Sequence, residues 1–162
     1  MNYLVEGYSV KKVHTNEHSH GSFFDGSLYR GSKEVASFEE KGDGAPMQIW
    51  YVNDEEKEDF QSVANLKEED CTFEVDAIVI EEMVNTFLLR KRVMSGRKKK
   101  VLIFVDGENG MVDEEYEINS PYSKSVANVI AEEFKGRKYH IGNEVFDLYP
   151  DGVDRVVQVS NE

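Results

Sequence analysis

The first fifty residues contain short apolar runs separated by glycine-containing breaks. Runs at residues 23–29 and 35–38 flank the turn Arg30-Gly31-Ser32-Lys33, a spacing that predicts a β-hairpin. A second break, Gly42-Asp43-Gly44-Ala45-Pro46, precedes the β-rich segment at residues 47–51, which predicts a third strand. We expect the glycines of this break to support a left-handed or tightly packed turn and not a phosphate-binding loop, because a strand and not a helix follows.

From Asn53 onward the apolar positions recur every three to four residues, which predicts helices. Asn53 is expected to cap the first helix, with Glu56 completing a capping box, and this helix ends within residues 65–70. A second helix is predicted at about residues 76–95, capped by Asp76 and ended by Gly96 in a left-handed conformation. Its apolar stripe is the strongest periodic signal in the chain and consists of Ile80, Met83, Val84, Phe87 and Leu88.

The remaining third of the chain predicts another hairpin and another helix. The continuous apolar run at residues 101–105 indicates a strand covered on both faces, and the acid-rich segment 111–118 indicates an outer strand with one wet face. Ser120 followed by proline predicts the start of a third helix, which Lys135-Gly136 ends. Further strands are predicted at residues 139–141, 145–149 and 153–159.

This order of elements predicts an α+β fold: an N-terminal antiparallel meander, two helices, a middle hairpin, a third helix and a terminal hairpin. Each helix has one apolar stripe, so we expect about three helices packed on one face of the sheet or sheets. A length of 162 residues suits a single domain over residues 1–162, with a division near residue 70 as the alternative.

The composition limits the expected cellular location of the protein and the kinds of site that it could contain. With 32 acidic and 19 basic residues the formal charge is −13, and Cys71 is the single cysteine, which excludes an intramolecular disulfide and a cysteine zinc cluster. We find no apolar stretch long enough for a membrane span and no secretory signal at the start, so we expect a cytoplasmic protein that does not bind membranes. No phosphate-binding Gly-x-x-x-x-Gly-Lys loop or Gly-x-Ser-x-Gly nucleophile elbow occurs, and no cofactor is indicated.

Runs of acidic residues form the first candidate site. Spaced carboxylates can imitate DNA phosphates and occupy the basic groove of a nucleic-acid enzyme. The alternative is that they are solvated faces that keep the protein soluble. The residues proposed to bind a partner are Asp54, Glu55, Glu56, Glu58, Asp59, Asp113, Glu114 and Glu115.

A basic segment within residues 90–100 forms the second candidate site. Seven positive charges in eleven residues could bind phosphates, but cations also favour a helix C-terminus, and the rest of the chain repels nucleic acid. Nucleic acid is therefore the less favoured partner. The proposed anion-binding residues are Arg90, Lys91, Arg92, Arg97, Lys98, Lys99 and Lys100.

A histidine-rich segment forms the third candidate. His14-x-x-Glu17-His18 has the letters of an inverted zinc-protease motif, which works on a helix. Here the segment lacks an apolar stripe, so we expect a loop, either solvated or holding zinc or nickel. The residues of this metal hypothesis are His14, Glu17, His18 and His20.

Two turns and their flanking strands carry a resemblance to a protein family. The pattern Leu28-Tyr29-x-Gly31-x-Lys33-x-Val35-Ala36, followed by the break at 42–46, resembles a set of uncharacterised proteins from bacteriophages and prophage-bearing bacteria. In that set the second turn has an asparagine and a further glycine, which are replaced here by Glu39 or Glu40 and by Ala45. The similarity spans about residues 22–146 and implies a phage or mobile-element source and an accessory role in the host cytoplasm. The set has no agreed activity.

Taken together, these features predict binding rather than catalysis. The leading hypothesis is a non-catalytic, phage-type accessory protein that binds a host protein through an acidic surface, with inhibition of a nucleic-acid-handling or defence enzyme as its extension. One alternative is a metal-dependent hydrolase or small-ligand-binding domain built on the histidine cluster. The other is nucleic-acid binding through residues 90–100.

Overall fold

The computed structural model describes residues 5–18, 21–67 and 74–150. The chain divides into two compact units, which we call the N-terminal unit (residues 2–87) and the C-terminal unit (residues 88–162). The long helix α2 (Val75–Gly96) contributes its first part to one unit and its last part to the other. Each unit is described by itself, and the single-domain interpretation stays a prediction.

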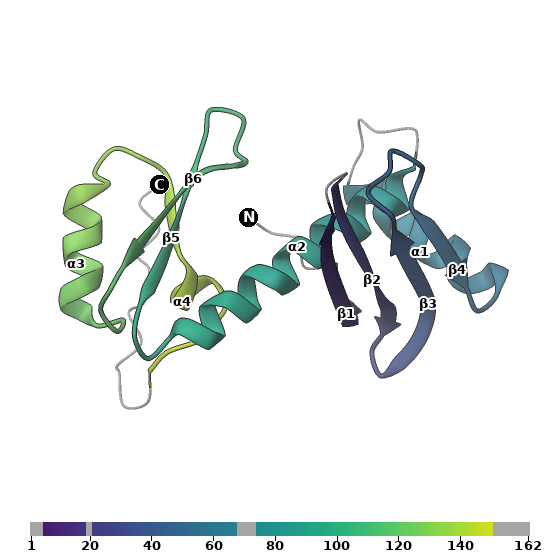
Figure 1. Ribbon diagram of the computed structural model, residues 1–162, viewed down its shortest axis with the longest axis horizontal. Coiled ribbons are helices and arrows are strands. Elements are labelled where there is room, and N and C mark those ends of the chain that lie inside the picture. The colour runs from purple at the N-terminus through teal and green to yellow at the C-terminus, as the bar shows by residue number, and fades with distance from the viewer. Residues whose placement is uncertain (1–4, 19–20, 68–73, 151–162) are drawn as a thin grey trace. The chain divides into compact units, whose positions relative to one another are not determined.

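The N-terminal unit contains a four-stranded antiparallel sheet in the order β1-β2-β3-β4 (Figure 1). At the predicted hairpin Arg30 pairs with Lys33, and Gly31 has a φ of 61°, which a two-residue hairpin loop requires and glycine adopts at little cost. The predicted hairpin and third strand are thereby confirmed. The strands are β1 (Tyr8–His18), β2 (Gly21–Arg30), β3 (Lys33–Glu40) and β4 (Gln48–Tyr51).

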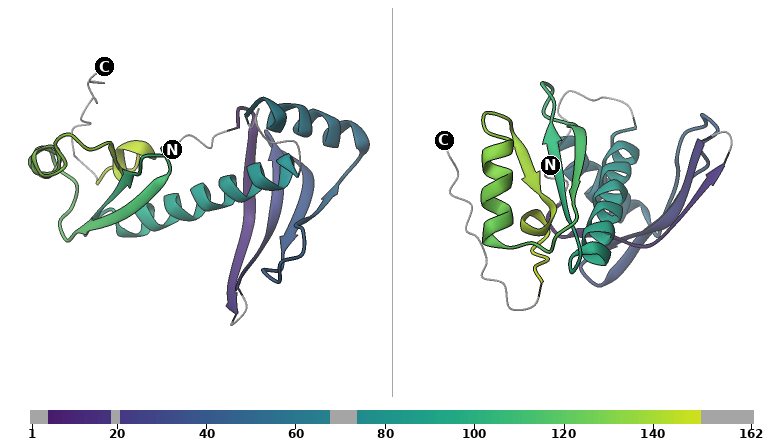
Figure 2. Two further views of the ribbon diagram at one scale, coloured as in Figure 1. Left: turned by 90° about the horizontal axis from the view of Figure 1, so that it is seen from above. Right: turned by 60° about the vertical axis from the view of Figure 1, so that its left-hand side comes forward.

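Helices α1 (Asp54–Lys67) and α2 cover one face of this sheet (Figures 1 and 2). The cap prediction for α1 is confirmed, because the Asn53 side-chain oxygen accepts a hydrogen bond of 2.8 Å from the Glu56 N–H. The fully buried Phe60 of α1 meets the ring of Tyr8 edge to face at 5.0 Å between centroids. Burial of this apolar stripe against the strands is what holds α1, whose surface is otherwise acidic.

Two predictions about the ends of α2 are wrong. The helix begins at Val75, so Asp76 lies in its first turn and not at the cap, and its carboxylate accepts hydrogen bonds from Tyr51, Gln61 and the Ala77 N–H. Gly96 is the last helical residue and is not left-handed; a Cβ there would lie 2.9 Å from the Lys100 side chain. Tyr51 and Gln61 come from β4 and α1, and local helix-end rules do not include such distant partners.

The C-terminal unit has a three-stranded antiparallel sheet in the order β6-β5-β7, with helices on both faces (Figure 1). Its central strand β5 (Val101–Asp106) lies between β6 (Val112–Ile118) and β7 (Tyr139–Ile141). Residues 101, 103 and 105 pack against α3 (Lys124–Glu133), while Leu102 and Phe104 pack on the other face with Val93 of α2 and Leu148. Burial on both faces was predicted from the unbroken apolar run of β5 and is confirmed.

Other predictions for this unit need correction. Ser123, and not Ser120, caps α3 by accepting a hydrogen bond of 3.2 Å from the Val126 N–H. Residues 145–149 do not form a strand: the short helix α4 (Gly142–Val145) is followed by a turn, which the fully buried Asn143 holds by donating to the Leu148 carbonyl at 2.7 Å. The predicted strand at 153–159 lies outside the described residues.

The α+β class is confirmed by two antiparallel sheets and the helices packed on them. Helices on a single face, as predicted, are found for the four-stranded sheet, whereas the three-stranded sheet has helices on both faces because β5 is apolar on both. Among the described helices, none has the length and apolarity to cross a membrane.

Candidate functional site

The segment with the histidines is a strand, so the prediction of a loop is wrong. Residues 14–18 of β1 pair with residues 21–25 of β2, and four residues of strand span about 13 Å, which removes the helical spacing of the zinc-protease motif. His14 is 72% exposed and lies 2.9 Å from the Asp25 carboxylate. The side chains of Glu17 and His18, and all of His20, lie outside the described residues. Among the residues that are described, no three His, Cys, Asp or Glu side chains converge to hold a metal ion.

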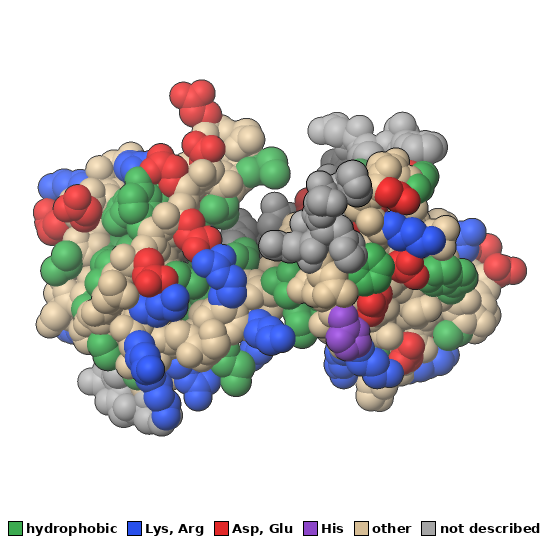
Figure 3. All heavy atoms as spheres, in the orientation of Figure 1, with side chains coloured by type: hydrophobic (Ala, Val, Ile, Leu, Met, Phe, Trp, Pro, Cys, Tyr) green, Lys and Arg blue, Asp and Glu red, His purple; other side chains and the backbone are tan. Residues whose placement is uncertain are grey.

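The basic segment is partly neutralised within its own unit. Arg92 makes a two-pronged ion pair with Glu115 of β6, and Lys100 lies 2.7 Å from Glu117. On the face of the C-terminal unit seen in Figure 3, blue and red side chains lie next to one another. Of the seven predicted anion-binding residues, those without an ion pair in the described part of the chain are Arg90, Lys91, Arg97 and Lys99.

Ion pairs within the C-terminal unit also neutralise most of the predicted acidic site on β6. Glu115 pairs with Arg92, as described above, and Glu114 pairs with Arg137 and accepts a hydrogen bond from Tyr116. Hydrogen bonds from these two partners lower the pKa of Glu114. Asp113, the third predicted residue, is exposed. Two of the three predicted carboxylates on β6 therefore make ion pairs within the C-terminal unit.

On α1 the five predicted carboxylates fall into two groups. The Glu56 carboxylate is buried and lies 3.0 Å from Arg30 and 2.9 Å from Lys33, and Asp59 also pairs with Arg30 at 2.7 Å. These contacts tie α1 to the β2–β3 turn, so Glu56 makes tertiary ion pairs where a capping box was predicted. The exposed carboxylates without an ion pair in the described residues are Asp54, Glu55 and Glu58.

Replacing Glu56 by glutamine tests this structural role. We expect Glu56→Gln to lower the free energy of unfolding of the N-terminal unit by about 1.5 kcal/mol, because Arg30 and Lys33 lose a buried anion but remain partly solvated. Urea denaturation followed by circular dichroism measures the change. Glu55→Gln, one residue away and exposed, is the control and should change stability by less than about 0.5 kcal/mol. Equal effects of both variants would contradict the role.

The net charge of the protein lies almost entirely in the N-terminal unit. Residues 2–87 contain 19 acidic and 7 basic side chains, a formal charge of −12, whereas residues 88–162 contain 13 acidic and 12 basic side chains, a formal charge of −1. A surface that attracts cations is therefore expected in the N-terminal unit.

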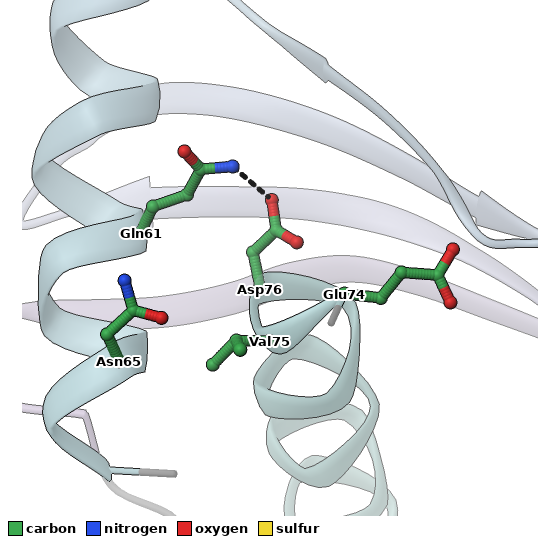
Figure 4. A pocket seen from close by; sticks show the side chains of 5 residues that line it. All are labelled: Gln61, Asn65, Glu74, Val75 and Asp76. Atoms are coloured by element: carbon green, nitrogen blue, oxygen red, sulfur yellow. Dashed lines mark hydrogen bonds between the residues drawn. The ribbon is translucent and has the colours of Figure 1, made fainter. Parts of the chain in front are cut away.

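One hollow of this unit, of about 410 Å³, lies between α1 and the start of α2. Gln61 and Asn65 extend from α1, and Glu74, Val75 and Asp76 come from the start of α2 (Figure 4). The amide of Gln61 donates to Asp76 at 3.2 Å, which leaves its oxygen as an acceptor. The polar groups around this hollow are mainly hydrogen-bond acceptors.

A second hollow, of about 230 Å³, lies between the β3–β4 loop and the next turns of α2. Its lining combines apolar side chains with three carboxylates, of which Glu40 accepts a hydrogen bond from the Gly42 N–H at 3.0 Å. The apolar lining comes from Ala45, Pro46, Met47, Ala77 and Ile78, and the carboxylates are those of Glu40, Glu74 and Glu81.

Glu74 lines both hollows. Its φ of 51° is rare for a residue other than glycine, and in Figure 4 its side chain points away from α1. None of the described residues lining either hollow is Lys, Arg or His, and none of the four lining carboxylates has an ion pair in the described chain. We refer to these two spaces as the Glu74 hollows.

No pattern in the sequence predicts the Glu74 hollows. Glu40 lies 34 residues before Glu74 in the chain, and no spacing connects them. Asp76 was noticed only as a helix cap, although its carboxylate accepts from Tyr51 at 2.8 Å, and burial together with this bond raises the pKa of Tyr51. The one sequence signal available for these hollows was the break at residues 42–46, which is predicted to be a turn and not a phosphate-binding loop.

A buried acid-base pair in the C-terminal unit was also missed. Asp106, at the end of β5, has a side chain only 1% exposed; its Oδ2 lies 2.9 Å from His140 Nε2 and 3.4 Å from Lys138 Nζ. Burial raises the pKa of Asp106, but the hydrogen bonds and charges of His140 and Lys138 outweigh burial and leave this pKa below its usual value. Because these contacts tie the end of β5 to residues 138–140, we assign the pair to structure.

Comparison with known proteins identified no matching family model, no curated relative and no similar solved structure.

Proposed function

We propose that this protein is a non-catalytic binding protein whose acidic N-terminal unit recognises a basic segment of another protein. The observation that carries the proposal is the set of carboxylates at the Glu74 hollows, which have no ion pair in the described chain. A carboxylate already paired must lose one partner to gain another, whereas these are available to an incoming cation.

The distribution of charge supports the same partner. A unit with a formal charge of −12 attracts cationic surfaces at distances up to about a Debye length, roughly 10 Å at 0.1 M salt. The acids of β6, by contrast, lie in the nearly neutral unit and pair with Arg92, Lys100 and Arg137. The predicted partner-binding residues lie on α1 and on β6, and we therefore propose that the partner binds the N-terminal unit and not β6.

The resemblance to phage proteins extends the proposal to a class of partner. A host enzyme that handles nucleic acid presents a groove of Lys and Arg side chains for phosphates, and carboxylates can occupy such a groove. We propose a host protein of this kind, with inhibition as the consequence of occupying its groove.

Selection from a random peptide library displayed on an unrelated carrier tests the proposal. We expect the immobilised protein to enrich peptides rich in Lys and Arg, because its unpaired acids favour cations, and this enrichment should weaken as salt is raised from about 0.1 M to 1 M. Sequencing of the selected pool measures the result. A pool no richer in Lys and Arg than the starting library would refute the proposed function.

A further inference from the structure

The second of the Glu74 hollows is lined by both apolar side chains and carboxylates. Pro46, Met47 and Ile78 provide aliphatic surface, and Glu40, Glu74 and Glu81 provide the carboxylates. A purely electrostatic surface would need no such aliphatic lining. A Lys or Arg side chain has both parts that this arrangement fits, namely an aliphatic stem and a cationic head.

The first hollow continues the same chemistry on the other side of Glu74. Gln61 and Asn65 offer carboxamide oxygens, and Asp76 offers a carboxylate that is held in place by hydrogen bonds from Tyr51 and Gln61. Arg presents five N–H donors and no acceptor, which matches a lining that consists mainly of acceptors. Anionic ligands are disfavoured because no cation lines either hollow among the described residues.

We infer that the Glu74 hollows form a docking site for a protein segment in which an Arg or Lys lies next to an aliphatic residue. The basic side chain is recognised by the carboxylates and the aliphatic residue by the apolar lining of the second hollow. This inference rests on the proposed function and adds to it the place of binding and the need for an apolar neighbour.

Three synthetic six-residue peptides test the inference on the full chain. One alternates arginine and leucine, one alternates arginine and serine, and one alternates glutamate and leucine, each with a fluorescent label for anisotropy measurements at about 0.1 M salt. We expect the arginine-leucine peptide to bind at least fivefold more tightly than the arginine-serine peptide, because only the former buries apolar surface. The glutamate-leucine peptide should not bind.

Two triple variants with the same change of net charge locate the site. Glu40→Gln, Glu74→Gln and Glu81→Gln together should weaken binding of the arginine-leucine peptide about tenfold, since each exposed ion pair contributes a modest share. The matched control, Asp54→Asn, Glu55→Gln and Glu58→Gln, removes three exposed acids of α1 and should weaken it less than threefold. Unchanged circular dichroism spectra establish that both variants fold.

The outcomes separate the inference from the proposed function. If both arginine peptides bind equally, or if the two triple variants lose equal affinity, binding depends on net charge alone, and the docking site is refuted while the proposed function stands. If neither arginine peptide binds better than the glutamate-leucine peptide, the proposed function itself fails.

Discussion

Replacing Gly142 by alanine is expected to lower the free energy of unfolding of the C-terminal unit by about 3 kcal/mol. Gly142 begins α4 and is buried, and a Cβ at this position would lie 2.6 Å from Val93 Cγ2, 3.3 Å from Phe104 Cε2 and 3.4 Å from the Leu102 carbonyl oxygen. Val93 is β-branched and buried, so it cannot turn away without moving the helix or the strand. Denaturant unfolding measures the change.

A double-mutant cycle with Val93→Ala separates this clash from other effects of alanine. Removing the Val93 methyl groups leaves space for the new Cβ, so Gly142→Ala should cost much less in the Val93→Ala background than in the natural chain. Asn128→Ala, on an exposed position of α3, is the control and should change stability by less than about 0.5 kcal/mol. Strictly additive effects of the two substitutions would show that the contact does not explain the glycine.

Replacing His140 by alanine is expected to cost about 3 kcal/mol at neutral pH, because a buried carboxylate loses its nearest partner. Asp106 would retain Lys138, whose side chain is 73% exposed and whose Nζ lies 3.4 Å away. His14→Ala is the matched control: it removes an imidazole at the same 2.9 Å from a carboxylate, but at an exposed position, and should cost less than about 1 kcal/mol.

The pH dependence gives a second measurement of the same pair. Because the pKa of Asp106 is lower in the folded chain than in the unfolded chain, the stabilisation is present above the unfolded-state pKa and disappears as the pH falls through the folded-state pKa. His140→Ala should raise the folded-state pKa of Asp106, which carboxyl-carbon NMR titration detects. An unchanged pKa in this variant would show that His140 does not stabilise the carboxylate.

The histidine, basic and acidic clusters show why the predicted sites were only partly useful. All three were predicted from residue type along the chain, but His14 and His18 lie along the strand β1, and Glu114, Glu115 and Glu117 of β6 make ion pairs with Arg137, Arg92 and Lys100. The spacing of residues along the chain does not show which oppositely charged side chain of another segment will pair with each residue.

The sequence by itself determined the features that depend on neighbouring residues. The turn at Gly31, the cap at Asn53 and the double burial of β5 all follow from backbone preferences or from a periodicity of a few residues. For the same reason the α+β class and the concentration of acids could be predicted from the order and composition of the segments.

Only the tertiary structure decided which carboxylates of the described residues have an ion pair and which do not. Glu56 and Glu74 look alike in sequence, each in an acid-rich segment near the start of a helix. Folding buries Glu56 against Arg30 and Lys33, while Glu74 lies between two hollows whose described lining residues include no cation. The physical reason is that the environment of a carboxylate is set by segments distant along the chain, which meet only when sheet and helices pack.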